Sequence, residues 1–271
     1  MKEKYNQMPN FTVHTYINCE STVDLEKEHS YQFAINGCNI RKNMDLVFSE
    51  CDYLSEKEIS DFVAIVQLHI YCMPDIPDLS EMIFILDEET EDSSCSGQSV
   101  YNFIRKELTI KNEAGEPEML SQEGIKEIDR GYALNIIEIH TLYINPKYRG
   151  KNISSFILQK LSEFLSFYFN INVGFVTTYI NPFKAEPKIK LDEESGLMMP
   201  FLNGKMYCDY ELDTEKVKII RKMLKSLDFK SVDEEKRTYV TTISRLNKKA
   251  EKNGIRKKEK IILESGLFKY F

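Results

Sequence analysis

The segment from residue 132 to 180 constrains the fold most, because it is patterned as a strand, a turn, a helix and a second strand. Residues 133–144 are rich in β-branched side chains, and Pro146 stops this run because proline cannot continue a hydrogen-bonded ladder. Over residues 153–168, apolar side chains recur every three or four positions, which predicts an amphipathic helix. Residues 173–180 are a second β-rich run. A helix between two strands favours a parallel pair with a right-handed crossover, so the segment predicts an α/β protein.

The turn between the first strand and the helix is basic and contains one glycine. The first N–H groups of a helix lack partners within the helix, and the helix dipole is positive at that end. Gly150 would let the backbone approach a phosphate, while Lys147, Arg149 and Lys151 add positive charge. By itself the pattern leaves two alternatives open, an anion-binding site and an ordinary turn.

Residues 137–155 resemble the central motif of the GCN5-related N-acetyltransferase (GNAT) superfamily. In that family a strand leads into a Q/R-x-x-G-x-G/A turn whose backbone amides bind the pyrophosphate of acetyl-CoA. Here Lys147 stands at the leading Gln/Arg position, Gly150 is the first glycine, and Asn152 replaces the second Gly or Ala. Asparagine adopts positive φ more readily than most residues, so we expect the turn to be preserved.

The resemblance extends to a late helix and hairpin, where Asp228-Phe229 replaces the Gly-Phe pair of the family. It implies a mixed, twisted β-sheet flanked by helices. The implied division of the chain is an N-terminal elaboration (1–30), a GNAT-like domain (31–244) and a basic C-terminal extension (245–271). Within the domain we expect a core motif (132–182), an inserted segment (182–213) and a closing helix and hairpin (214–243).

The resemblance also implies acetyl-CoA as cosubstrate and an amine of unknown identity as acceptor. Backbone groups at the bulge and splay of the first strand would pair with the pantetheine arm, and the turn would hold the pyrophosphate. The implied cofactor-binding residues are Leu142, Tyr143, Ile144, Lys147, Tyr148, Arg149, Gly150, Lys151, Asn152, Ile153, Ser154, Ser155 and, after the second strand, Asn181.

Acetyl transfer to an amine needs a proton acceptor, and Glu138 is the first candidate. It aligns with a strand glutamate that some GNAT enzymes use. Strand side chains alternate, so we expect Glu138 to share a face with His140 and Leu142, and apolar neighbours to raise its pKa. The structural alternative is a glutamate at the exposed end of a strand or one paired with Lys or Arg. His140 is the second candidate base, its alternative being a structural histidine.

The general acid is the weaker part of the resemblance. Many family members place a tyrosine in the late helix, where this chain has Leu224. Tyr207 and Tyr210 are the candidates to replace it. Two functions therefore remain: an N-acetyltransferase that works through a direct ternary complex, or an inactive GNAT-like regulatory module that keeps acyl-CoA binding and acts through a protein or nucleic-acid partner.

Two segments are candidates for partner binding. Residues 197–202 form an apolar cluster inside a long loop, which predicts a lid, a self-association or protein contact, or a tuck onto the core. Residues 245–260 are strongly basic, which predicts weak contact with an anionic partner such as RNA or a membrane surface, or a helix that is solvated or clamped on the acidic body. The net charge of −7 argues against wholesale nucleic-acid binding.

The six cysteines and four histidines are scattered, with no C-x-x-C pair, so we expect reduced thiols, no metal site and a cytoplasmic protein. No apolar run is long enough to span a membrane, and the start lacks a signal segment.

Elsewhere the pattern predicts further elements. The expected elements are strands at 11–17, 31–35 and 82–86, a helix at 56–72 begun by a capping box, an acidic loop at 87–97, a helix or strand at 99–113, a loop with a short helical piece at 111–131, a helix from residue 213 or 214 to 227, a hairpin at 229–243 and a helix from 245 to about 254.

Overall fold

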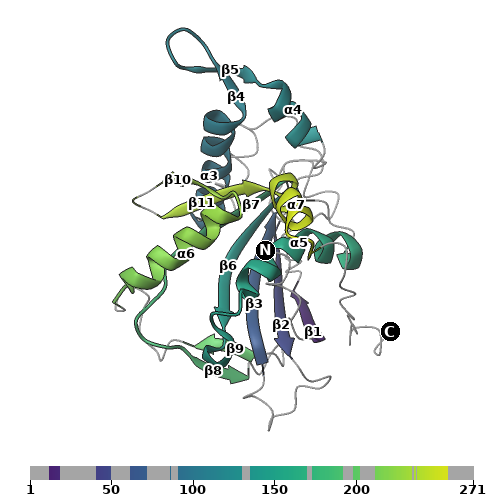
Figure 1. The fold of residues 1–271 in the computed structure, drawn as a ribbon, viewed down its shortest axis with the longest axis vertical. Helices are drawn as coiled ribbons and strands as arrows, with labels where there is room; N and C mark the ends of the chain where they lie inside the picture. The colour runs from purple at the N-terminus through teal and green to yellow at the C-terminus, as the bar shows by residue number, and fades with distance from the viewer. Residues whose placement is uncertain are drawn as a thin grey trace, which may run out of the picture.

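A computed structural model shows the architecture of the chain (Figure 1). It describes residues 12–18, 41–49, 62–71, 86, 91–129, 135–169, 173–191, 198–201, 211–233, 235 and 237–255.

A seven-stranded mixed sheet forms the centre of the fold, in the order β1-β2-β3-β6-β7-β11-β10. Every neighbouring pair is antiparallel except β6 and β7, which are parallel and are joined by a helix as the sequence predicts. The predicted α/β arrangement with a mixed sheet is therefore confirmed. The strands are β1 (Thr12–Asn18), β2 (Arg41–Ser49), β3 (Phe62–Tyr71), β6 (Ile136–Ile144), β7 (Phe175–Tyr179), β10 (Lys230–Asp233) and β11 (Thr238–Thr242).

Helices cover both faces of the sheet (Figure 1). Helix α3 (Glu91–Glu107) packs Phe103 and Ile104 on one face, against Ile136 of β6. On the other face lie α5 (Ile153–Phe169), α6 (Thr214–Ser226) and α7 (Ile243–Lys252), whose apolar side chains share a single cluster. The central strands are consequently buried on both sides.

Smaller elements extend from the two ends of the sheet (Figure 1). Beyond α3 lie the hairpin of β4 (Thr109–Lys111) and β5 (Pro117–Leu120) and the short helix α4 (Gln122–Asp129). Near the opposite end, β8 (Lys188–Leu191) pairs with β9 (Met198–Phe201). The inserted segment is thus more regular than the sequence suggests.

Several predicted elements are confirmed: the strand at 11–17, the two strands and helix of the central motif, the late helix, the closing hairpin and the C-terminal helix. The late helix begins where expected, because the side chain of Asp213 accepts a hydrogen bond from the backbone N–H of Lys216 (3.0 Å). A short helix also occurs within residues 111–131, as predicted.

The predicted helix at 56–72 is wrong over its described part, because residues 62–71 form the interior strand β3. Phe62 to Val66 are all buried, since both faces of this strand pack against protein. A nearly continuous apolar run satisfies the helical spacing and the spacing of a doubly buried strand equally well. Here the β-branched residues and the pairing with β2 and β6 favour the strand.

The predicted strand at 82–86 and loop at 87–97 are also wrong where the structure describes them. Leu86 is helical, and α3 begins at Glu91. The helix was hidden because small residues make part of its inward face: Ser96 and Gly97 are buried, and a Cβ on Gly97 would lie 2.7 Å from Cδ1 of Leu86. Residues 99–113, which the pattern left undecided, continue the helix to Glu107 and then enter β4.

The first part of the basic extension is clamped on the body of the protein. In α7, Leu246 and Ala250 are buried, and Nε of Arg245 lies 3.1 Å from Oε2 of Glu127. Nη1 of Arg245 also lies 3.5 Å from Oε2 of Glu107. These contacts agree with the clamped alternative for this part of the extension. The rest of the extension, from residue 256 onward, lies outside the described residues, as does the strand predicted at 31–35.

Within the described residues, no helix combines the length and the apolar character needed to cross a membrane.

Candidate active site

Strand β6 carries a bulge at the point where its pairing with β7 ends. Gln67 of β3 faces Thr141, and Leu68 faces Ile139, which leaves His140 as the extra residue of β6. On its other side, β6 pairs with β7 only as far as Ile139 opposite Thr178. Strand β7 ends one residue later, at Tyr179, so residues 140–144 of β6 have no ladder partner on the β7 side among the described residues.

Leu142, Tyr143 and Ile144 lie in the last part of β6, past its final pairing with β7. On the side away from β7 they remain paired with β3. A cofactor arm lying along the β7 side of this part of β6 could therefore take up backbone hydrogen bonds without breaking the sheet. Asn181 follows β7 by two residues and is half-buried.

The bulge changes which side chains share a face. Before it, Ile137 and Ile139 pack in the cluster beneath α5; after it, Leu142 and Ile144 pack against the same cluster. The alternation has therefore shifted by one residue. The expectation that Leu142 shares a face with Glu138 is wrong, because a bulge adds one residue to the strand without adding one to its partner.

Glu138 points to the α3 side of the sheet, where four side chains surround its carboxylate. Its Oε2 accepts hydrogen bonds from Oη of Tyr71 (2.8 Å) and Oγ of Ser96 (3.0 Å). Nδ1 of His69 lies 3.5 Å from the same oxygen, and Nδ1 of His140 lies 3.9 Å from Oε1. The contacts come from β3, α3 and β6, so three elements together hold this carboxylate.

These contacts overturn the expected pKa shift of Glu138. Burial by itself raises the pKa of this carboxyl. Hydrogen bonding to His140, His69 and Tyr71, together with the charge of His69, has the larger and opposite effect, so the pKa lies well below the ordinary 4.5. Glu138 is consequently ionised at neutral pH and is a poor proton acceptor. Its location suits it to hold and stabilise a neighbouring imidazole.

His140 is the more accessible member of the cluster. Its side chain is 39% exposed, against 14% for Glu138. Its ring stacks on the ring of His69, with centroids 4.6 Å apart and planes 28° apart. An imidazole that is backed by a carboxylate and open to solvent can receive a proton from an incoming amine.

The basic turn forms as the resemblance implies. A short 3₁₀ helix, η3 (Pro146–Tyr148), is capped by the side chain of Asn145, which accepts a hydrogen bond from Lys147 N (3.1 Å). Gly150 has φ 77° and Asn152 has φ 63°. The expectation that asparagine tolerates the unusual backbone of the second Gly/Ala position is therefore confirmed.

The turn leads directly into α5. The carbonyl of Asn152 accepts the first helical hydrogen bond, from Phe156 N (3.0 Å). The N–H groups of Ile153, Ser154 and Ser155 thus belong to the first turn, where a helix has no internal partners for them. The ammonium groups of Lys147 and Lys151 lie 5.2 and 5.0 Å from the ring of Tyr148, which is itself buried. Two cations and a helix N-terminus therefore meet at the turn.

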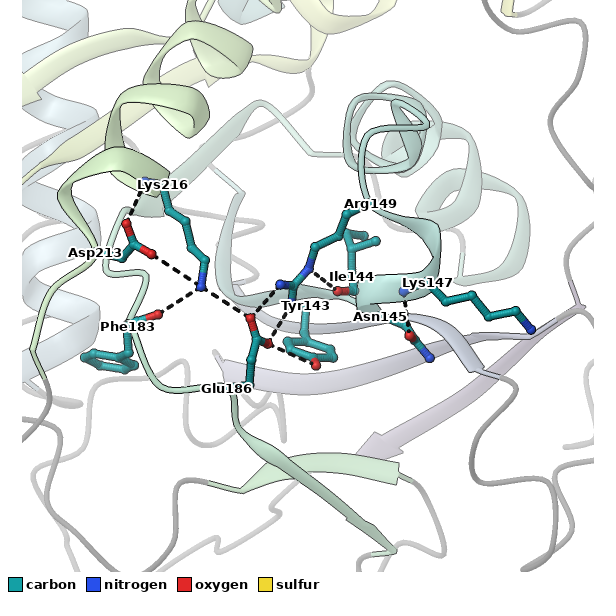
Figure 2. Close-up of polar contacts among 9 residues, drawn as sticks. All are labelled: Tyr143, Ile144, Asn145, Lys147, Arg149, Phe183, Glu186, Asp213 and Lys216. Carbon is teal, nitrogen blue, oxygen red and sulfur yellow. Dashed lines mark hydrogen bonds and ion pairs between the residues drawn. The ribbon is translucent and has the colours of Figure 1, made fainter.

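Arg149 is paired rather than directed at the helix N-terminus (Figure 2). Its Nη1 and Nη2 donate to the two carboxylate oxygens of Glu186 at 2.5 and 2.7 Å, and its Nε donates to the carbonyl of Ile144 (2.9 Å). Glu186 also lies 3.3 Å from Nζ of Lys216 and accepts a hydrogen bond from Oη of Tyr143 (3.4 Å). This network, the Glu186 network, ties the segment after β7 to the end of β6 and to the start of α6.

The network sets the ionisation of Glu186. Hydrogen bonding from Arg149 outweighs the effect of burial, and with the charge of Lys216 it lowers the pKa of Glu186 from 4.5 to about 2. Because the pKa is lowered in the folded protein, the ionised carboxylate stabilises the fold above about pH 4.5. That contribution is lost as the pH falls toward 2.

We therefore expect Glu186→Gln to lower the free energy of unfolding at pH 7 by at most about 1 kcal/mol, because the pair is partly exposed. The difference from the wild type should shrink as the pH falls from about 4.5 toward 2, because both side chains are then neutral. Urea unfolding at pH 7, 5 and 3 measures this. The control is Glu211→Gln, which removes a more exposed partner of Lys184 in the same segment. Equal differences at pH 7 and pH 3 would contradict the assignment.

The predictions about the late helix and the candidate general acid concern residues away from the side chains around Glu138. Leu224 is buried in the core, so the position of the usual family tyrosine has a packing role here. Asp228, at the position of the family glycine, adopts φ 68° as a glycine would. Tyr207 and Tyr210 lie outside the described residues.

The sequence reasoning missed His69, Tyr71, Ser96 and Glu186. His69 lies directly opposite Glu138 only in the register with which β3 pairs with β6, which the sequence pattern does not fix. Ser96 and Glu186 carried no local signal, because each depends on a contact between elements far apart in the sequence.

Comparisons with known proteins add one solved structure. No protein-family model matches the chain. No curated protein sequence matches it either. A crystal structure of arylalkylamine N-acetyltransferase 2 from Aedes aegypti is similar over 65% of this chain and 68% of that chain, at 15% sequence identity and a TM-score of 0.26. This is a distant similarity at the level of the fold.

Proposed function

We propose that the protein is an acetyl-CoA-dependent N-acetyltransferase that moves an acetyl group to a primary amine within a ternary complex. One arrangement carries this proposal: the pairing of β6 with β7 ends between the His140–Glu138 pair and the turn at the start of α5. A candidate phosphate-binding turn, an unpaired strand edge for a cofactor arm and a candidate proton acceptor thus follow one another along β6 and the residues after it.

The turn would hold the pyrophosphate. The N–H groups of residues 153–155 and the positive end of the helix dipole attract an anion, and Lys147 and Lys151 add charge. Gly150 leaves this approach open, because a Cβ placed there would have no heavy atom within 4 Å. Arg149 would act indirectly, by holding the end of β6 and the segment around Glu186 in place.

The reaction forms one bond and breaks one. The amine nitrogen attacks the thioester carbonyl carbon, the carbon–sulfur bond breaks, and CoA leaves as the thiolate. A backbone N–H on the unpaired edge of β6 would polarise the carbonyl oxygen. The proton lost by the amine would pass to the imidazole of His140, and the carboxylate of Glu138 would stabilise the imidazolium that forms. Tyr207 and Tyr210 stay candidates for protonating the thiolate.

The proposed acetyl acceptor is a primary amine. The acidic balance of the chain favours a cationic amine or a lysine-rich peptide, by attraction rather than by a shaped pocket. A partner contact through residues 197–202 and a cytoplasmic location stay predictions. Of that cluster, Met198–Phe201 form β9, paired with β8.

A turnover assay tests the proposal. The purified chain is incubated with acetyl-CoA and a panel of amines, comprising aryl-alkylamines, polyamines, amino sugars and lysine peptides. Release of the CoA thiol is followed with a thiol reagent, and the product by mass spectrometry. We expect amine-dependent thiol release with an acetylated product. Acetyl-CoA binding without turnover of any amine would instead support the regulatory module.

A further inference from the structure

Two imidazoles and one carboxylate converge on the α3 side of the sheet. His69 of β3, and Glu138 and His140 of β6, each offer one ligand atom, and these atoms all lie within 4.8 Å of one another. The bulge creates this arrangement. His69 faces Glu138 across the ladder, and the extra residue His140 brings a second imidazole to the same carboxylate.

We propose that His69, Glu138 and His140 bind a divalent transition-metal ion, with Zn²⁺ as the best match. Two histidine nitrogens and one carboxylate oxygen are a ligand set that Zn²⁺ accepts, with water in the fourth position. The same set with additional open positions suits other first-row divalent ions such as Fe²⁺ and Co²⁺. This inference goes beyond the acetyl transfer proposed above and does not depend on it.

The side chains must rotate to bring three ligand atoms to one ion, because the two imidazoles contact different oxygens of Glu138 and their rings are stacked. Metal–ligand bonds of about 2.0–2.1 Å place neighbouring ligand atoms of a tetrahedral site about 3.3 Å apart. Nδ1 of His69 lies 3.5 Å from one oxygen of Glu138, and Nδ1 of His140 lies 3.9 Å from the other. The partly exposed His140 has the freedom to close the remaining difference.

The surroundings supply the outer contacts that metal ligands use. Tyr71 and Ser96 both donate to Oε2 of Glu138, which orients the carboxylate with Oε1 toward His140. Side-chain exposures of 12% for His69 and 14% for Glu138 shield these ligands, while the 39% exposure of His140 leaves a side from which an ion and its water can enter.

Metal binding and the proposed base role of His140 exclude each other. An imidazole that coordinates an ion through Nδ1 carries its proton on Nε2, so it cannot accept another. The metal-bound protein is therefore expected to be inactive in acetyl transfer, and a chelator should restore any activity that Zn²⁺ suppresses.

Direct binding to the full-length chain tests the site. The protein is stripped with a chelator, then titrated with Zn²⁺ by calorimetry and with Co²⁺ by visible absorption. We expect one ion per chain. His140→Gln and His69→Gln should each weaken binding at least about 100-fold, and Tyr71→Phe about 10-fold by loosening the carboxylate.

The matched control is His14→Gln in β1, three strands away from β6 in the sheet. It removes a histidine outside the cluster and should leave the affinity unchanged. Circular dichroism and thermal unfolding check that each variant folds. If His69→Gln does not fold because His69 is the more buried residue, the comparison of His140→Gln with the wild type still tests the site. Wild-type binding no tighter than that of His140→Gln would overturn the proposal. Failure here leaves acetyl-CoA binding and turnover, which are measured separately, unaffected.

Discussion

Replacing Gly150 by glutamate is expected to weaken acetyl-CoA binding by about 100- to 1,000-fold. A carboxylate placed about 4 Å from a pyrophosphate oxygen, near the protein surface, costs about 4 kcal/mol per charge pair, and each 1.4 kcal/mol is tenfold in affinity. The substitution also forces a bulky residue into the left-handed backbone at φ 77°. Calorimetric titration of wild type and variant with acetyl-CoA measures the loss.

Gly115→Glu is the matched control for this experiment. Gly115 lies in the β4–β5 hairpin, has φ 81° and, like Gly150, has no heavy atom within 4 Å of a Cβ placed on it. The control therefore reproduces the backbone strain and the added charge away from the turn. If Gly150→Glu and Gly115→Glu both bind acetyl-CoA as tightly as the wild type, the turn is not part of the cofactor site.

His140→Gln is expected to lower turnover by about 100- to 10,000-fold, the range that a lost general base costs. Its affinity for acetyl-CoA should stay close to that of the wild type, because the side chain faces the α3 side of β6 and does not belong to the turn. Steady-state rates with a saturating amine, together with a separate acetyl-CoA titration, measure the two effects.

Glu138→Gln distinguishes the two candidate bases. It removes the charge beside His140 but keeps an oxygen that can accept from Tyr71 and Ser96. We expect a smaller loss of turnover than for His140→Gln, because Glu138 positions the imidazole and does not itself take the proton. A larger loss in Glu138→Gln than in His140→Gln would return the base role to Glu138.

The part of the site that the sequence predicts well lies within the central motif. The turn, the positive φ of Asn152, the following helix and the parallel strand all depend on interactions among neighbouring residues. Turn chemistry and amphipathic spacing report such interactions directly. The cap at Asp213 is predictable for the same reason.

The part that the sequence misses depends on pairing between distant segments. His69 and Tyr71 reach Glu138 only because β3 pairs with β6 in one register, across 67 residues in the case of Tyr71. The spacing that predicted a helix at 56–72 concealed that strand. Because a slip of one residue would turn every side chain to the other face, neither the strand nor its partners could be inferred from local pattern.

The sequence by itself determined the strand, turn, helix and strand that make the candidate phosphate site, since these follow from backbone preferences and apolar spacing over a few residues. Only the tertiary structure decided the bulge at His140, the convergence of His69, Glu138 and His140, and the pairing of Arg149 with Glu186. Those features arise when strands align in register and when a segment far along the chain brings its charge to the turn. Local propensity does not encode either event.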